Sequence, residues 1–184
     1  DKPVFDYISR WKLPESNYNI SKITIRSLLE HTAGLSVHGY NGFESKNELT
    51  SLEECLSGRN NLEEKVELIM APQSKWKYSG GGYSILQLLI EEVSGRKFAE
   101  FMKKEVFDPL QMEDTSFSIN KEILENSAKG YNEEGKEIPL RLFNAQAAAG
   151  LHTTLEDLIV FAKATLSNER TILSKNTIEK MMVP

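Results

Sequence analysis

Apolar residues recur three and four positions apart along most of the chain, which is the spacing of an amphipathic helix. Several stretches begin with a Ser, Thr or Asn cap, and Thr24 is paired in this way with a closing Gly34. Two stretches carry the capping-box pattern, with glutamates three residues after Ser51 and Asn61. These patterns predict helices near residues 24–32, 52–57, 62–70, 82–94 and 97–106, another from Leu155 to Leu166, and a last one from Ser174 through Met181.

The pattern also ranks these helices by burial and indicates where helices stop. Residues 82–94 are apolar almost all round, which predicts a central, buried helix that ends at Gly95. Residues 128–140 show no helical period and predict a small hairpin with Gly135 in its turn. Long irregular loops are expected at 34–50 and 107–150, and long ordered loops often cover a site. The predicted fold class is mainly α with a small β hairpin.

Composition excludes several classes of function. The chain has 184 residues and a net charge of −5, with 27 acidic and 22 basic residues mixed along it, so nucleic acid is not an expected partner. Cys55 is the single cysteine, so the chain has no internal disulfide. We expect Cys55 itself to be a small, buried apolar side chain. No apolar run reaches the roughly 18 residues of a membrane span. The histidines are not paired at helical spacing and the glycine run matches no phosphate-binding loop, so neither a metal nor a cofactor is expected.

The stretch KWKYSGGGYSILQ, residues 75–87, contains the main candidate for chemistry. Three glycines stand before the buried helix, although each glycine weakens a helix by about 1 kcal/mol. The glycines are typical of a sharp turn or of a tyrosine that must be held at the rim of a site. A tyrosine can act as a general base, but its free pKa of about 10 requires nearby cations. The residues alone leave two readings open for Tyr78, a catalytic base and a core or turn tyrosine.

Four segments, in order along the chain, resemble the serine β-lactamase-related family of class C β-lactamases, DD-peptidases and esterases. The segments are ITIRSLLEHTAGL (23–35), residues 75–117 beginning KWKYSGGGYSILQ, AAAGLHTTLEDLIVFAKA (147–164) and ILSKNTIEKMM (172–182). The resemblance implies an α+β fold of which residues 1–184 form a single helical subdomain. It also implies a serine nucleophile in S-x-x-K, a tyrosine in Y-x-N and a K/H-[ST]-G strand. The implied partner is a small-molecule or peptide substrate, such as a β-lactam, a D-Ala-D-Ala-like peptide or an ester.

The resemblance assigns residues one by one. Tyr78, Ser79 and Gly80 fall on Y-x-N, which makes Tyr78 the base that takes the serine proton, with the S-x-x-K lysine as its cation. Gly80 departs from the motif, whose Asn hydrogen-bonds the lysine and the substrate amide, so ester or peptide substrates are favoured over β-lactams. The resemblance also implies that the loop with His38 and Tyr40 lines the rim of the substrate cleft. A comparable rim stretch is implied for Ala149 and Gly150.

The other two motifs of the family are missing from the expected places. S-x-x-K occurs at Ser9, Ser74, Ser94 and Ser118, but none of the four opens a long buried helix, and no K-T-G or H-T-G occurs. We therefore expect the middle segment of a penicillin-recognising serine hydrolase, truncated at both ends and inactive alone, whose parent is extracytoplasmic or membrane-associated. Truncation would expose an apolar face and allow self-association. The alternative is a non-catalytic binding or interaction module on the same scaffold.

Overall fold

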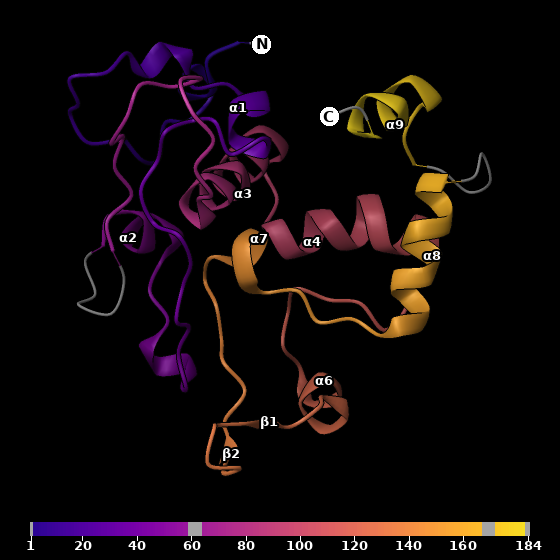
Figure 1. Ribbon diagram of the computed structural model, residues 1–184. Coiled ribbons are helices and arrows are strands. Elements are labelled where there is room, and N and C mark those ends of the chain that lie inside the picture. Colours follow the sequence, from indigo (N-terminus) through magenta and orange to yellow (C-terminus); the bar gives the residue numbers. More distant parts are fainter. Residues whose placement is uncertain (1, 59–63, 167–171, 183–184) are drawn as a thin grey trace.

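A computed structural model describes residues 2–58, 64–166 and 172–182, and it is mainly helical with one hairpin (Figure 1). A π-helical stretch, Lys103–Phe107, joins α4 (Phe98–Met102) to α5 (Asp108–Leu110). The strands β1 (Gly130–Tyr131) and β2 (Glu137–Ile138) pair antiparallel. No helix in this part of the chain has both the length and the apolar character to cross a membrane. The helices are α1 (Ile25–Leu29), α2 (Leu52–Leu56), α3 (Gly80–Ser94), α4 (Phe98–Met102), α5 (Asp108–Leu110), α6 (Lys121–Asn126), α7 (Gln146–Ala149), α8 (Leu155–Leu166) and α9 (Lys175–Met182).

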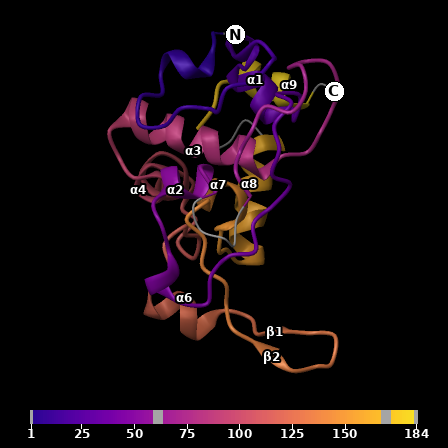
Figure 2. The ribbon, with the colours of Figure 1, turned by 90° about the vertical axis from the view of Figure 1, so that its left-hand side faces the viewer.

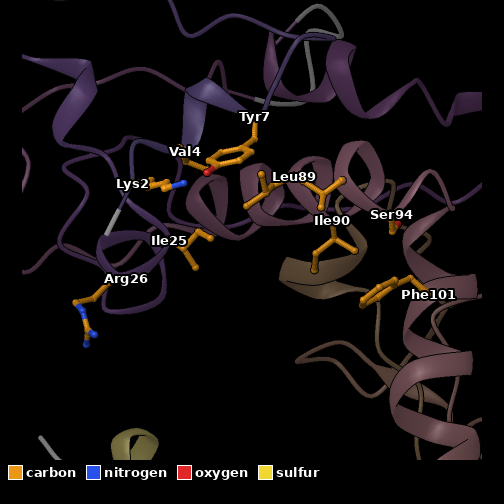
Figure 3. A pocket seen from close by; sticks show the side chains of 10 residues that line it. Lys2, Val4, Tyr7, Ile25, Arg26, Leu89, Ile90, Ser94 and Phe101 are labelled. Carbon is orange, nitrogen blue, oxygen red and sulfur yellow. The ribbon is translucent and has the colours of Figure 1, made fainter. Parts of the chain in front are cut away.

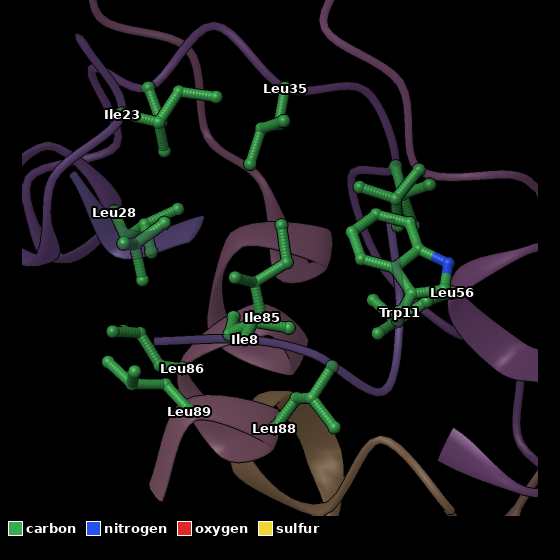
Figure 4. Close-up of a cluster of buried hydrophobic side chains, with 14 of the residues drawn as sticks. Ile8, Trp11, Ile23, Leu28, Leu35, Leu56, Ile85, Leu86, Leu88 and Leu89 are labelled. Atoms are coloured by element: carbon green, nitrogen blue, oxygen red, sulfur yellow. The ribbon is translucent and has the colours of Figure 1, made fainter. Parts of the chain in front are cut away.

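Helix α3 is the centre of the larger hydrophobic core (Figure 4). Its Ile85 and Leu88 are fully buried, and α1 supplies Leu28 and α2 supplies Leu56 to the same cluster. The N-terminal segment adds Val4, Ile8 and Trp11. A second, smaller cluster forms around Phe107, Leu110 and Met112, with Ala164 of α8. The prediction that residues 82–94 form a central buried helix is therefore confirmed.

Charged side chains fasten the N-terminal segment to the central helices. The Arg10 guanidinium pairs with Glu53 of α2 at 2.5 Å and with Glu91 of α3 at 3.0 Å. The backbone N–H groups of Ser9 and Arg10 both donate to the Glu92 carboxylate. These contacts hold the N-terminal segment against the C-terminal part of α3.

Most predicted helices are confirmed, with different ends. Helix α1 stops at Leu29 because His31 adopts a left-handed conformation with φ of 57°. The capping boxes of Thr24 with Ser27 and of Ser51 with Glu54 are both present. The predicted helix 97–106 continues through the π-helical stretch to Leu110. The hairpin is confirmed, with Gly135 at a φ of 75°.

The helix predicted at 62–70 is wrong over the residues that the structure describes, 64–70. These residues run extended beside the loop after α1, where Leu35 and Leu68 form an antiparallel bridge. Val66 and Leu68 are buried while Glu67 and Ile69 are exposed, which is the two-residue period of a strand. The glutamates at the start imitate a capping box, but the alternation after them decides the structure. Residues 62 and 63, at the predicted start, lie outside the described residues.

The loop predicted at 107–150 holds three short helices, α5, α6 and α7, whose few residues give no helical period to recognise. In both views α6 and the hairpin lie at the end of the molecule opposite to α1 and α9 (Figures 1 and 2). The loop predicted at 34–50 is confirmed as irregular, with one helical turn at Lys46–Glu48.

Candidate active site

Tyr78 lies directly before Ser79, the residue that caps the N-terminus of α3. Its side chain is 39% exposed, and its phenolic hydroxyl makes no hydrogen bond within the described residues. The rings of His31 and His38 lie against the Tyr78 ring, at centroid distances of 4.4 and 4.8 Å. A phenol held by its ring with its oxygen free is in a position to bind or accept a proton from a ligand.

His31 holds the backbone on both sides of Tyr78. Its carbonyl accepts a hydrogen bond from the N–H of Lys77 at 2.8 Å, and its Nδ1 accepts one from the N–H of Ser79 at 3.2 Å. The His31 ring also stacks on Tyr83 at 5.2 Å. Burial lowers the pKa of the His31 imidazole, which favours the neutral form that this acceptor role requires.

The loop at residues 36–38 satisfies the first N–H groups of α3. The carbonyls of His38 and Val37 accept from Gly80 and Gly81, at 3.0 and 3.3 Å. Ser79 Oγ donates to the carbonyl of Ser36 at 2.5 Å and accepts from Gly82 N–H at 3.2 Å. Because these donors are paired, the helix end offers no free amides to an anion and instead holds the loop rigidly beside Tyr78.

The three glycines do not form the sharp turn that we predicted. Gly80, Gly81 and Gly82 form the first turn of α3, and none has a positive φ. A Cβ on Gly80 would lie 3.0 Å from the carbonyl oxygen of His38, and one on Gly81 would lie 2.9 Å from Val66. The glycines therefore allow the loop and the extended segment to approach the helix backbone closely.

Tyr40, a predicted rim residue, is half-buried, and its hydroxyl oxygen is 2.8 Å from Ser84 Oγ of α3. His38 is exposed and contacts Tyr78 through its ring. Ser79 is buried with its hydroxyl engaged by backbone groups. The structure therefore places His38 against Tyr78, and it places Tyr40 against the first turn of α3, beside Gly80 and Ser84.

Ala149 and Gly150 lie at the end of α7, which is held on the middle of α3 by Gln87. The Gln87 amide donates to the carbonyl of Asn144 and accepts from the N–H of Ala147, both at 3.0 Å. Gly150 borders a pocket of about 100 Å³ that Gln146 and His152 also line. Tyr78 does not border this pocket, so the second rim stretch forms a separate feature.

None of the four S-x-x-K serines stands at the first turn of a helix. Ser94 ends α3, and Ser9, Ser74 and Ser118 are outside the helices. Ser9 Oγ donates to Glu92 and Ser74 Oγ donates to the carbonyl of Ala71. Among the described residues no group of three or more His, Cys, Asp or Glu side chains is placed to hold a metal ion.

An apolar pocket of about 560 Å³ lies on another face of α3 (Figure 3). Leu89 and Ile90 of α3 line it together with Ile25 of α1, Phe101 of α4 and Tyr7. None of the predicted site residues borders it. The pocket is therefore a feature of the packing surface and not part of the site around Tyr78.

The family model described as Beta-lactamase matches residues 1–184. The chain belongs to the Beta-lactamase family. This is a family of serine hydrolases of the β-lactamase and penicillin-binding type, which bind small-molecule or peptide substrates.

Three relatives extend this result. PbpX of Bacillus subtilis (strain 168) is 28% identical over 173 residues, which are 90% of this chain and 40% of the relative. The human serine beta-lactamase-like protein LACTB, mitochondrial, is 31% identical over 62% of this chain and 22% of the relative. The octameric penicillin-binding protein homologue from Pyrococcus abyssi superimposes over 100% of this chain and 42% of its own, with a TM-score of 0.73 and 27% identity. The chain spans less than half of the length of each of these relatives.

His31 is the residue of the site that sequence reasoning missed. The sequence pattern of the histidines bears only on metal binding, and His31 stands 47 positions before Tyr78. No spacing rule connects the two positions, because only the packing of the loop after α1 on the start of α3 brings them together. The one local signal was its place inside EHTAGL, a segment that resembles the family.

Proposed function

We propose that this chain is the helical part of a longer serine hydrolase, in which Tyr78 is the general base. The observation that carries the proposal is the half-exposed Tyr78, whose ring contacts two imidazole rings and whose hydroxyl makes no hydrogen bond within the described residues. Two non-glycine residues with positive φ, His31 and the β-branched Val37, both bind the backbone around it. Such strained conformations persist where the surrounding structure enforces them, and they cluster at functional sites.

In this proposal the nucleophilic serine and its lysine lie outside residues 1–184. The serine oxygen attacks the carbonyl carbon of the substrate while its proton passes to the Tyr78 oxygen. Tyr78 then gives that proton to the leaving oxygen or nitrogen as its bond to the carbonyl carbon breaks, which leaves an acyl-enzyme. Water attacks the acyl carbonyl and loses a proton to Tyr78, which returns it to the serine oxygen as the acid departs. The substrate is an ester, a D-Ala-D-Ala-like peptide or a β-lactam, and the residues of the site require no metal or cofactor for these steps.

The cation that this chemistry needs comes, we propose, from the S-x-x-K lysine. Neither the Lys75 nor the Lys77 side chain donates a hydrogen bond to Tyr78 within the described residues. Nδ1 of His31 accepts a hydrogen bond and burial lowers its pKa, so this imidazole is neutral. A neutral imidazole does not favour the tyrosinate by charge. The base therefore depends on a group that another part of the protein supplies.

Gly80 favours ester or peptide substrates in this proposal. The position that holds Asn in the Y-x-N motif has no side chain here, and a Cβ at this position would lie only 3.0 Å from the carbonyl oxygen of His38. The same feature favours the second candidate, a non-catalytic binding module, because the motif amide that binds substrate is absent. Activity of the full-length protein distinguishes the two candidates.

The test is Tyr78→Phe in the full-length protein, assayed with an activated acyl ester. The substitution removes the proton-accepting oxygen and keeps the ring packing, so kcat should fall by roughly 100- to 10,000-fold with folding unchanged. Tyr131→Phe is the matched control, because Tyr131 is exposed on the hairpin at 58%. Activity of Tyr78→Phe within threefold of the wild type would remove Tyr78 from catalysis, and an inactive wild type would favour the binding module.

A further inference from the structure

We propose that His31 is the positioning residue for Tyr78, and that it acts in its neutral form through Nδ1. This inference rests on the proposed function, since it concerns how the general base is held. It assigns a role to a histidine that the family motifs named above do not include.

One residue contacts three consecutive residues of the site. The carbonyl of His31 binds Lys77 N–H at 2.8 Å, its ring lies 4.4 Å from the Tyr78 ring, and its Nδ1 binds Ser79 N–H at 3.2 Å. The backbone is thus fixed immediately before and after Tyr78, while the ring limits the rotation of the phenol. Reacting groups must be held in this way, because a displacement of about 1 Å can cost on the order of 100-fold in rate.

The Ser79 hydrogen bond requires unprotonated Nδ1. An imidazolium has N–H donors on both nitrogens and cannot accept a bond from a backbone N–H. The accepting Nδ1 therefore assigns the neutral tautomer with its proton on Nε2. The aromatic rings of Trp76, Tyr78 and Tyr83 contact the His31 ring, and His38 contacts the Tyr78 ring. No ion pair between a carboxylate and His31 occurs within the described residues, and such a pair would favour the cation.

The backbone of His31 is itself held in an uncommon state. Its φ of 57° is left-handed, and it places the carbonyl toward Lys77 and the ring toward Ser79. Asn adopts this conformation more readily than most other residues. The side-chain oxygen of Asn can also stand near the place of Nδ1 as an acceptor. His31→Asn therefore keeps the acceptor and loses the ring, whereas His31→Phe keeps a ring and loses the acceptor.

The first measurement is amide hydrogen exchange of Ser79 in the full-length protein, which needs no catalytic activity. In His31→Phe the Ser79 N–H has no partner, so its exchange should be at least about tenfold faster than in the wild type. In His31→Asn the rate should stay within about threefold. Equal exchange rates in all three proteins overturn the inference, whatever the fate of the proposed function.

The second measurement is the split between kcat and KM in the full-length protein. We expect His31→Phe to lower kcat about 10- to 100-fold with KM within about twofold, and His31→Asn to stay within about threefold of wild-type kcat. The wild-type kcat should also fall at acid pH as His31 is protonated, and His31→Asn should lack that limb. An equal fall of kcat in His31→Phe and His31→Asn overturns the role of Nδ1. An unchanged kcat in both variants, together with an inactive Tyr78→Phe, overturns it as well. If Tyr78→Phe keeps full activity, the proposed function fails first.

Discussion

Two histidines are partly buried, and burial lowers the pKa of both His31 and His152 below the usual 6.5. A group whose pKa is lower in the folded state binds fewer protons there than in the unfolded state. The folded state is then at its most stable above the unfolded pKa and loses stability as the pH falls toward the folded pKa. The direction is set by desolvation, because neither imidazole has a carboxylate partner among the described contacts.

We therefore expect the free energy of unfolding of this chain to fall between pH 7.5 and pH 5.5. Urea unfolding at the two pH values measures the difference. His31→Asn and His152→Asn should each make the difference between the two free energies of unfolding smaller, because Asn does not titrate. Burial raises the pKa of Glu92, but hydrogen bonds from Arg10 and Ser9 outweigh it and bring the pKa below 4.5, so Glu92 acts below this window. An equal midpoint at both pH values in the wild type would contradict the prediction.

Helix α3 begins with three glycines whose surroundings differ, although their sequence positions look equivalent. A Cβ on Gly81 would meet Val66 at 2.9 Å, which is closer than real Cβ atoms approach other atoms. A Cβ on Gly82 would lie 3.5 Å from Leu28, an ordinary contact. The close approach of the extended segment 64–70 therefore selects glycine at one position and only permits it at the next.

The comparison of Gly81→Ala with Gly82→Ala tests this explanation. Gly81→Ala should destabilise the chain by about 1–3 kcal/mol, because the Val66 side chain must move. Gly82→Ala should be neutral or stabilise by up to about 1 kcal/mol, because alanine is the better helix former. Thermal and urea unfolding measure both. The explanation fails if Gly81→Ala is as stable as Gly82→Ala.

The molecule as a whole exposes a large part of the apolar surface of its helices. On α8, Leu155 and Leu166 are 69% and 81% exposed, and Leu158 and Ile159 are nearly half exposed. Val93 of α3 is 67% exposed beside the apolar pocket. The four residues of α8 recur at helical spacing on one face, and an exposed apolar face of this kind favours association.

We expect this chain to self-associate at high concentration, and sedimentation velocity measures it. Leu166→Lys should weaken association without loss of stability, because the side chain is exposed and a cation near the end of α8 suits the helix dipole. Glu156→Gln is the control, since it changes the net charge by the same +1 and removes no apolar surface. Equal association in both variants would mean that charge rather than apolar contact controls it.

The sequence by itself determined the helices whose stabilising information is local. Thr24 and Ser51 cap α1 and α2, and a residue three positions later completes each capping box. Gly95 ends α3 because glycine easily adopts the left-handed conformation that it has there. The apolar residues of 82–94 predicted the core helix because their spacing is also a property of the local sequence. Tyr78 and the rim residues His38 and Tyr40 came from motif resemblance, and the structure gathers them at one helix end.

Only the tertiary structure decided which elements lie against the start of α3. Residues 64–70 run extended because Leu35 pairs with Leu68 and Val66 packs on Gly81, and none of these contacts can be read from the local pattern. The same packing turns the three glycines into a contact surface and places His31 against Tyr78. Non-local contacts of this kind override local propensity, because burial and hydrogen bonding with distant segments outweigh the fraction of a kcal/mol by which neighbouring residues prefer a helix.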